Sequence, residues 1–194
     1  MNQRLLEKFI EATLGESIRS RTFDLREFKS LDNLEDAWFY AIDHLKPMGG
    51  GSSRSVFIMS SSKVLKLTKP QAPEKGIAQN ENEHKISSDP RFESVVPHVF
   101  EHHRDFNWLI SELVRPLTNE EQFQVLTGID WSTFINELRG TNKPTTKFAR
   151  TIINLAEEMS SFNEFSTLEH WGKTFDGRAV ILDTGWSFDV SKHY

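Results

Sequence analysis

Residues 47–67 combine a glycine-rich stretch with a lysine further along the chain, and together they could bind a phosphate. The segment reads PMGGGSSRSVFIMSSSKVLKL, with Gly49 and Gly51 near its start and Lys66 near its end. Glycine lets backbone amides approach a phosphate closely. Lys66 lies between two leucines of a predicted strand, so it points away from them and could reach back to that phosphate. Short glycine motifs also occur in ordinary hairpin turns, and strand lysines often face solvent, so these residues alone leave both explanations open.

Two carboxylates further along the chain could complete such a site. Glu83 lies in the polar sequence QNENE, where a helix would allow it to pair with Lys66, since a buried carboxylate needs a partner. Asp183 follows an apolar strand in DGRAVILDTGWS, a position from which it could hold Mg²⁺ against phosphates. The alternatives are a solvated helix face for Glu83 and an ordinary turn for Asp183.

Periodicity and turn residues predict the elements that must position these side chains. Helices are expected over residues 2–14, 32–45 (capped by Asp32 or Asn33), 74–86, from 118 onward with Thr118 as cap, 131–139 and 146–162. Strands are expected over 55–59, 63–67, 95–101, 108–114 and 179–182, with a turn at Asp176-Gly177. Pro47 and the glycines after it are expected to end the second helix. This order predicts an α+β fold, in which a small antiparallel sheet carrying one helix precedes a mostly helical part and a terminal hairpin.

The composition excludes several classes of function. The chain has 194 residues, a net charge of −5 and no cysteine. The negative charge argues against binding to nucleic acid or to an anionic membrane, and the lack of cysteine excludes disulfides and thiol catalysis. We expect a cytoplasmic protein, because no run is long enough to span a bilayer and the N-terminal sequence lacks the apolar core of a signal peptide. His98, His102 and His103 cluster without a known metal-binding spacing, which favours a solvated loop.

In the order of glycine-rich loop, strand lysine, helix glutamate and strand-end aspartate, the chain resembles the protein-kinase-like fold. GGGSSRSVF is similar to the G-x-G-x-x-G-x-V pattern with Arg54 at the third glycine's place, and KVLK is similar to V-A-I-K with Lys66 as its lysine. WLISELV resembles the strand that leads into the hinge, and ILDTG resembles the D-F-G segment with Asp183 as its aspartate. The resemblance covers roughly residues 45 to 190, and it is narrower to small kinase-like proteins of bacteriophages.

The resemblance implies an organisation and a ligand. It implies an N-terminal helical extension over 1–46, a kinase-like N-lobe over 47–115 and a minimal helical C-lobe with a terminal hairpin over 116–194. It also implies ATP with Mg²⁺, with Asp183 as metal ligand and His170 as a second one. The residues implied to bind the nucleotide are Gly49, Gly51, Ser52, Ser53, Arg54, Lys66, Glu83, Glu112 and Leu113. Arg54 could neutralise a phosphate or could face solvent.

The kinase catalytic loop H-R-D-x-x-x-x-N is missing, and NEFSTLEHWGKTF stands in its place. If His170 takes the asparagine position, the aspartate position falls on Phe165, and the neighbouring Glu164 could substitute as base. The chain also stops soon after Asp183, without an activation segment. We therefore expect a pseudokinase that binds a host or viral protein in the host cytoplasm, with or without a nucleotide. The alternatives are an active phosphotransferase that uses Glu164 and Asp183, and an interaction protein without a nucleotide.

Two features of the sequence leave their placement open. The helices predicted before residue 46 could pack over the kinase-like lobe or form a dimer interface. Trp171 and Trp186 flank the terminal hairpin, where packing in the core is the more frequent explanation and exposure would mark a partner surface.

Overall fold

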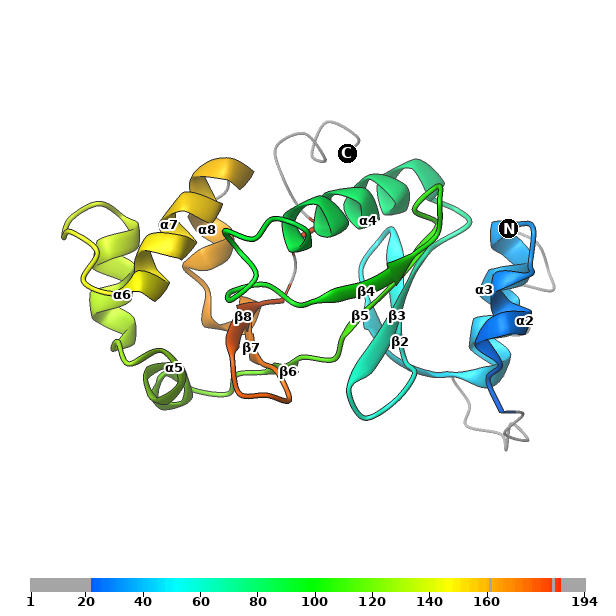
Figure 1. Ribbon diagram of the computed structural model, residues 1–194, viewed down its shortest axis with the longest axis horizontal. Coiled ribbons are helices and arrows are strands. Elements are labelled where there is room, and N and C mark those ends of the chain that lie inside the picture. The colour runs from blue at the N-terminus through cyan, green and yellow to red at the C-terminus, as the bar shows by residue number, and fades with distance from the viewer. Residues whose placement is uncertain (1–21, 161, 183, 186–194) are drawn as a thin grey trace.

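The computed structural model describes residues 22–160, 162–182 and 184–185, and the architecture is α+β, as predicted (Figure 1). The helices are α2 (Leu25–Lys29), α3 (Leu34–His44), α4 (Pro73–Ser87), α5 (Glu120–Thr127), α6 (Trp131–Leu138), α7 (Lys147–Met159), α8 (Phe162–Phe165) and the 3₁₀ helix η1 (Leu168–His170). The strands are β1 (Lys46–Gly50), β2 (Arg54–Ile58), β3 (Lys63–Thr68), β4 (Val99–His102), β5 (Trp108–Glu112), β6 (Arg115–Pro116), β7 (Trp171–Lys173) and β8 (Ala179–Ile181). The helix predicted over 2–14 and Trp186 lie outside the described residues.

The larger sheet has five antiparallel strands in the order β1-β2-β3-β5-β4, with β3 in its centre. Alternation along β3 divides its residues between the two faces of the sheet. Leu65 and Leu67 belong to the hydrophobic cluster formed with α3, whereas Lys66 contacts α4. The sheet therefore has an apolar outer face and a partly polar inner face.

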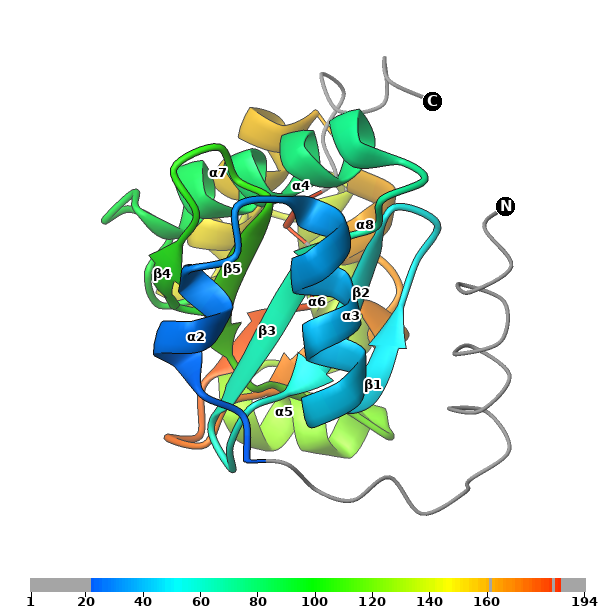
Figure 2. The same cartoon turned by 90° about the vertical axis from the view of Figure 1, so that its right-hand side faces the viewer.

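Helices α2 and α3 cover the outer face, in front of the strands in Figure 2. Asn33 caps α3 by accepting a hydrogen bond from the Asp36 amide, which confirms one of the two predicted caps. Trp38 of α3 packs against Phe57 of β2, with ring centroids 6.1 Å apart. The second predicted N-terminal helix therefore packs over the sheet, which was one of the two placements left open.

Helix α4 covers the inner face with polar side chains, since Gln79, Asn80 and Glu83 are all buried. The helix lies close to β3 at Gly76, where a Cβ atom would come within 2.6 Å of the Thr68 side chain. The sequence predicted a polar helix over 74–86, and the alternative of a solvated face is wrong for these residues because the polar stripe faces the sheet.

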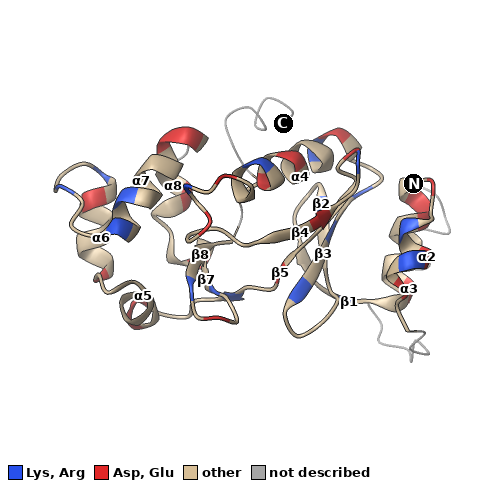
Figure 3. Cartoon of the chain, viewed as in Figure 1, with Lys and Arg blue, Asp and Glu red and all other residues tan. Residues whose placement is uncertain are grey.

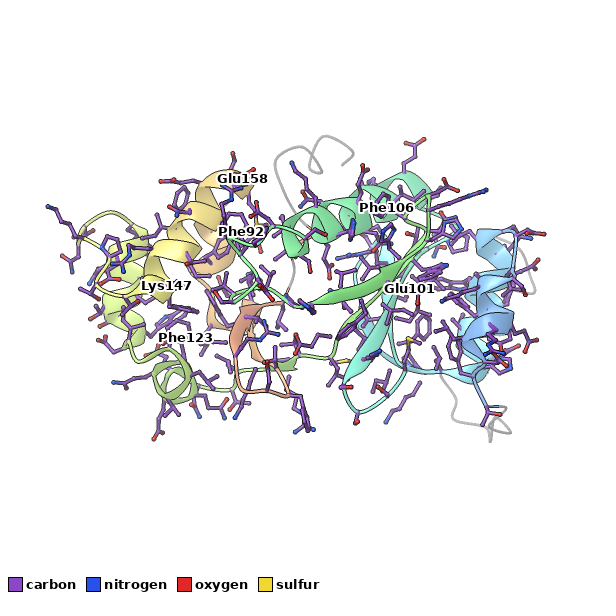
Figure 4. The ribbon with its side chains drawn as sticks, viewed as in Figure 1. Phe92, Glu101, Phe106, Phe123, Lys147 and Glu158 are labelled. Carbon is purple, nitrogen blue, oxygen red and sulfur yellow. The ribbon has the colours of Figure 1, made fainter. Side chains whose placement is uncertain are left out.

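The second hydrophobic cluster lies among α5, α6, α7 and the small antiparallel sheet β6-β7-β8. Trp171 of β7 is fully buried there, which agrees with the packing explanation, and Phe92 and Phe123 of the same cluster are labelled in Figure 4. Gly177 turns the β7–β8 hairpin with a φ of 90°, a conformation that favours glycine. Figure 1 shows this small sheet between the large sheet and helices α5–α8.

Several predicted boundaries were wrong for local reasons. Gly49 and Gly50 belong to strand β1 rather than only to a turn, whereas α3 ends at His44, before Pro47, as predicted. Asn119 caps α5 instead of Thr118, because its side chain accepts the Gln122 amide. Helix α7 ends at Met159 rather than 162, since Ser160 adopts a left-handed conformation with a φ of 51°. The strand predicted over 95–101 begins only at Val99, and the one predicted over 108–114 ends at Glu112.

Charge and hydropathy place no part of the described chain in a membrane helix. Across the described ranges, none of the helices combines the length and the apolar character needed to cross a bilayer. Acidic and basic residues are interspersed on α2 and α4 (Figure 3).

The domain boundaries after residues 46 and 115 stay predictions, although α3 shares a hydrophobic cluster with the sheet that follows it.

Candidate functional site

A cavity of about 470 Å³ lies between strands β1–β3 and the segments around β6 and β8, within the range of small-molecule sites. One wall comes from β1–β3 and the opposite wall includes Pro116 and Leu182. The predicted site residues that line it are Gly49, Gly51, Ser52, Ser53, Arg54, Lys66 and Glu112. Residues that the sequence did not single out also line it: Met48, Gly50, Val56, Val64, Gln79, Pro97, Val114, Pro116 and Leu182.

The glycine-rich segment is a hairpin whose glycines differ in what they require. A Cβ atom at Gly50 would lie 2.6 Å from the Arg54 carbonyl oxygen on the neighbouring strand, whereas Gly49 and Gly51 have open space around them. Gly50 therefore serves the pairing of β1 with β2, while the other two leave room in the cavity. Lys69 ties the hairpin to the end of β3, because its Nζ donates to the Gly51 carbonyl at 2.6 Å.

Two cations and one carboxylate meet at the wall of the cavity. Lys66 Nζ lies 2.5 Å from Glu83 Oε1, and Arg54 Nη1 lies 2.8 Å from Oε2 of the same carboxylate. The exposed fractions are 8% for Lys66, 7% for Arg54 and 0% for Glu83. A buried carboxylate is tolerated when it is paired and hydrogen-bonded, and here both oxygens have a cationic partner. Arg54 therefore does not face solvent, which was one of its two predicted placements.

Asn80 and Gln79 of the polar stripe hold this group in place, and neither was predicted as part of the site. Asn80 Oδ1 accepts from Arg54 Nη1 at 3.1 Å, and Asn80 Nδ2 donates to the Phe106 carbonyl at 2.7 Å. Gln79 Oε1 accepts from the Ser53 hydroxyl at 2.7 Å. Residues 76, 79, 80 and 83 recur at helical spacing and therefore share one face of the helix. A glycine followed by two amides and a carboxylate on that face is the sequence pattern that could have indicated this part of the site.

Thr184 and Gly185, which follow β8, contact α4 and the guanidinium of Arg54. Asn82 Nδ2 donates to the Thr184 carbonyl at 2.8 Å. A Cβ atom at Gly185 would lie 2.7 Å from Arg54 Nη2, so the backbone there passes close to the guanidinium. Asp183, the predicted metal ligand, lies outside the described residues. The described residues Thr184 and Gly185 lie beside Asn82 and Arg54.

Glu164 and His170 lie together, but neither lines the cavity. His170 Nδ1 is 3.0 Å from Glu164 Oε2 and 2.9 Å from the Glu164 carbonyl oxygen. The Leu182 amide donates to the His170 carbonyl at 2.7 Å, which brings the backbone of His170 next to the end of β8. The structure thus brings the predicted base and the predicted second metal ligand into contact with each other, with the His170 imidazole directed to Glu164.

Glu112 and Leu113, two of the residues that the resemblance implies for nucleotide binding, have separate positions. Glu112 lines the cavity, and its Oε2 accepts from Arg178 Nη2 at 2.5 Å. Leu113 does not line it, and the Leu113 amide donates to the Ser62 carbonyl at 2.8 Å. Arg178, which the sequence did not single out, therefore joins the β7–β8 hairpin to the end of β5.

The described ranges contain no group of three or more acidic or histidine side chains that could hold a metal ion. His102 instead stacks on Phe106, with ring centroids 4.8 Å apart, and its ring lies 4.1 Å from that of His84. The prediction of Mg²⁺ therefore stays with Asp183.

Comparison of the chain with models of known protein families gives no match, and comparison with curated proteins gives none either.

Proposed function

We propose that this protein is a kinase-like nucleotide-binding protein that acts as a pseudokinase, through a protein partner of the host or the virus. The observation that carries the proposal is the buried Lys66–Glu83 pair at the wall of a cavity that the glycine-rich hairpin also lines. Glu83 orients Lys66, and a lysine held in this way can donate to a phosphate oxygen. The arrangement corresponds to the pair implied by the resemblance to kinases.

The cavity is lined by both polar and apolar residues, and a nucleotide needs both. The phosphates would meet the small residues Gly49 and Gly51, the hydroxyl of Ser52 and the cation of Lys66. Val56, Val64, Val114, Pro116 and Leu182 supply apolar surface for a base. Sites for small molecules are commonly apolar, with a few convergent polar groups that set the orientation.

The pseudokinase part of the proposal rests on Glu164 and His170. They contact each other, and neither is among the residues that line the cavity. A general base must lie within hydrogen-bond reach of the proton that it removes. Output through a protein partner is supported by Phe175 and Phe100, which are 81% and 46% exposed and line a second hollow of about 670 Å³.

The first test compares Lys66→Met with Lys63→Met in nucleotide binding. Lys63 is an exposed residue of the same strand, so it is a matched control. In the Lys66 variant Glu83 keeps Arg54 as a partner, so the fold should persist. A nucleotide at 100 times its Kd stabilises the native state by about 2.7 kcal/mol, which is readily seen as a thermal shift. We expect Lys66→Met to weaken binding by about tenfold or more and Lys63→Met to leave it unchanged. If ATP and GTP, each with Mg²⁺, leave the melting temperature of the wild-type protein unchanged, nucleotide binding is refuted.

An active phosphotransferase is the second candidate, because His170 links Glu164 to the end of β8. The Leu182 amide donates to the His170 carbonyl, and His170 Nδ1 lies 2.9 Å from the Glu164 carbonyl oxygen. It predicts transfer of labelled γ-phosphate that Glu164→Gln abolishes while nucleotide binding persists. Binding without any labelled product, on the protein itself or on an added acceptor, supports the pseudokinase. A biological effect that Lys66→Met leaves unchanged would instead indicate an interaction protein that needs no nucleotide.

A further inference from the structure

We propose that the second hollow, together with the basic residues beside it, docks an acidic peptide segment of the partner protein. This inference rests on the proposed action through a protein partner and adds the chemistry of that partner. The hollow of about 670 Å³ lies among strand β4, the turn of the β7–β8 hairpin and the start of α7, which contribute Phe100, Phe175 and Lys147. The segment would place an apolar side chain in the hollow and its carboxylates on the basic residues.

Two exposed phenylalanines offer apolar contact at the hollow. Phe175 is 81% exposed and Phe100 is 46% exposed. Lys63 Nζ lies 4.6 Å from the centroid of the Phe100 ring, a cation–π contact that helps to hold the ring in place. Single exposed apolar residues are ordinary, but two aromatic residues around one hollow resemble the aromatic-rich centre of a protein interface. An apolar side chain of a partner is therefore the expected occupant of the hollow.

The charges that line the hollow balance one another. Arg178 Nη2 lies 2.5 Å from Glu112 Oε2, and Arg178 Nε lies 3.0 Å from Asp176 Oδ2, so one guanidinium holds two of the lining carboxylates. The charged lining residues are three cations, Arg91, Lys147 and Arg178, and three carboxylates, Glu93, Glu112 and Asp176. A hollow with this balance suits an uncharged side chain, and its carboxylates repel the phosphates of a nucleic acid.

A basic segment of the chain begins at the rim of the hollow. Residues 139–150 include Arg139, Lys143, Lys147 and Arg150 and no acidic residue, although the net charge of the chain is −5. All four basic residues are exposed, and they lie at the end of α6, in the loop after it and at the start of α7 (Figure 3). Lys147, labelled in Figure 4, belongs both to this segment and to the lining of the hollow, so it joins the two surfaces.

The stability of the helices explains only part of this basic segment. Arg139 follows the last residue of α6, where the helix dipole favours a cation. Lys147 and Arg150 are instead among the first four residues of α7, where the dipole favours acidic residues. Neither of them forms an ion pair with any residue that the structure describes. Their charges are therefore available to carboxylates of a partner.

The loop that carries Lys143 is already held in place by the protein. Glu137 is 1% exposed, and its Oε1 accepts from the Thr145 hydroxyl at 2.7 Å and from the Thr145 amide at 3.0 Å. The Thr141 amide donates to the Asn136 carbonyl at 2.9 Å. A surface that is ordered before binding avoids part of the entropic cost of association.

An acidic peptide fits both surfaces better than a nucleic acid does. A peptide can place an uncharged side chain in the hollow and carboxylates on Lys143 and Lys147, whereas a polyphosphate backbone would meet the carboxylates of the hollow. The net charge of −5 also opposes the binding of a polyanion over a large surface.

The first experiment selects random peptides, displayed on phage, against the full-length protein. Peptides of about 12 residues extend to about 40 Å, which is long enough to cover the hollow and the basic segment. We expect the enriched peptides to combine an aromatic or large aliphatic residue with several aspartates or glutamates close to it. The most enriched peptide is then labelled, and its Kd is measured by fluorescence anisotropy at several salt concentrations.

The second experiment reverses two charges of the basic segment. Lys143→Glu combined with Lys147→Glu should weaken binding of the labelled peptide by about tenfold or more and should reduce its dependence on salt. Lys46→Glu combined with Lys85→Glu is the matched control, because it changes the net charge equally at exposed residues that do not line the hollow. The control should keep the wild-type Kd.

The third experiment removes an aromatic ring from the hollow. Phe175→Ser should weaken binding of the same peptide by about tenfold or more, because truncation of an aromatic anchor removes a large share of the contact. Val125→Ser is the matched control, since Val125 is 77% exposed on α5 and does not line the hollow. Both side chains are exposed, so both variants should keep the melting temperature of the wild-type protein.

The outcomes separate this inference from the proposed nucleotide binding. Failure of every peptide to bind, enriched peptides without acidic residues, or a Kd that the double charge reversal leaves unchanged would each overturn the acidic partner, while thermal shifts with nucleotides report on the other site. Tighter binding of single-stranded DNA or RNA, lost in the same double variant, would overturn it in favour of a nucleic acid. Peptide binding by a protein that no nucleotide stabilises would refute nucleotide binding and keep this surface.

Discussion

Replacing Glu83 with glutamine should destabilise the protein strongly, although the two residues have nearly the same shape. Glu83 is fully buried and its two oxygens accept from Lys66 and Arg54. A glutamine retains one acceptor and turns an amide group toward the other cation. Arg54 keeps the Asn80 side chain as an acceptor, whereas Lys66 loses the carboxylate that it contacts at 2.5 Å. The variant therefore leaves positive charge buried without its counter-charge.

The expected magnitude follows from the burial of all three groups. Removing one partner of a buried ion pair costs about 3–5 kcal/mol, because the remaining charge stays desolvated. This is a large share of the roughly 5–15 kcal/mol by which a domain is stable. For a chain of this size, each kcal/mol lowers the melting temperature by about 2–4 °C, so we expect a fall of about 6–20 °C.

The assay is urea denaturation followed by circular dichroism, with thermal melting as a second measurement. Glu81→Gln is the matched control, since Glu81 is an exposed residue of the same helix, and it should change stability by about 0.5 kcal/mol or less. The double variant of Glu83→Gln with Lys66→Met should recover part of the loss, because it removes the cation left unpaired. A Glu83→Gln variant as stable as the Glu81→Gln control would refute this account of the charge cluster.

Two further variants test the hairpin and the histidine pair. Gly50→Ala should lower the free energy of unfolding by about 1–3 kcal/mol, because its Cβ would lie 2.6 Å from the Arg54 carbonyl oxygen, whereas Gly51→Ala should leave it nearly unchanged in urea denaturation. Burial, and next the neighbouring His102, lower the pKa of His84 below its ordinary 6.5. Acidification through pH 6.5 toward that lowered pKa should therefore destabilise the protein, because the unfolded chain binds the proton first. Denaturation at several pH values should show a shallower dependence for His84→Gln, and an unchanged slope would contradict this assignment.

Much of the fold could be predicted because its elements have strong local signals. The helix at 146–162 and the hairpin around Asp176-Gly177 follow from apolar spacing and from a turn pair, and both occur close to their predicted places. Strand β1 could not be predicted in this way, since Lys46–Gly50 is exposed along its whole length and has no alternation. Its pairing with β2 and the close approach at Gly50 are what make it a strand, and these depend on tertiary structure.

The candidate site was predictable where chain order was enough. Glycine hairpin, strand lysine and helix glutamate were expected to converge, and the structure brings Lys66 and Glu83 to 2.5 Å. The role of Arg178 could not be predicted, because its contacts with Glu112 and with the Glu93 carbonyl cross 66 and 85 residues of sequence. The burial of Arg54 could not be predicted either, since a guanidinium at a loop end reaches solvent as easily as a carboxylate on a distant helix.

The burial of Arg54 bears on whether this cleft is built to turn over a substrate or to hold one. Its guanidinium contacts Glu83 and lies beside Gly185, where a Cβ atom would come within 2.7 Å of it. Asn82 adds a hydrogen bond from α4 to the Thr184 carbonyl. The protein's own contacts thus join the hairpin, α4 and residues 184–185, so the proposed nucleotide would meet an assembled site, and its affinity would not be reduced by a small binding-competent population. Turnover needs loops that open to release product, and these contacts oppose such opening, which favours a protein that binds and holds over one that releases rapidly.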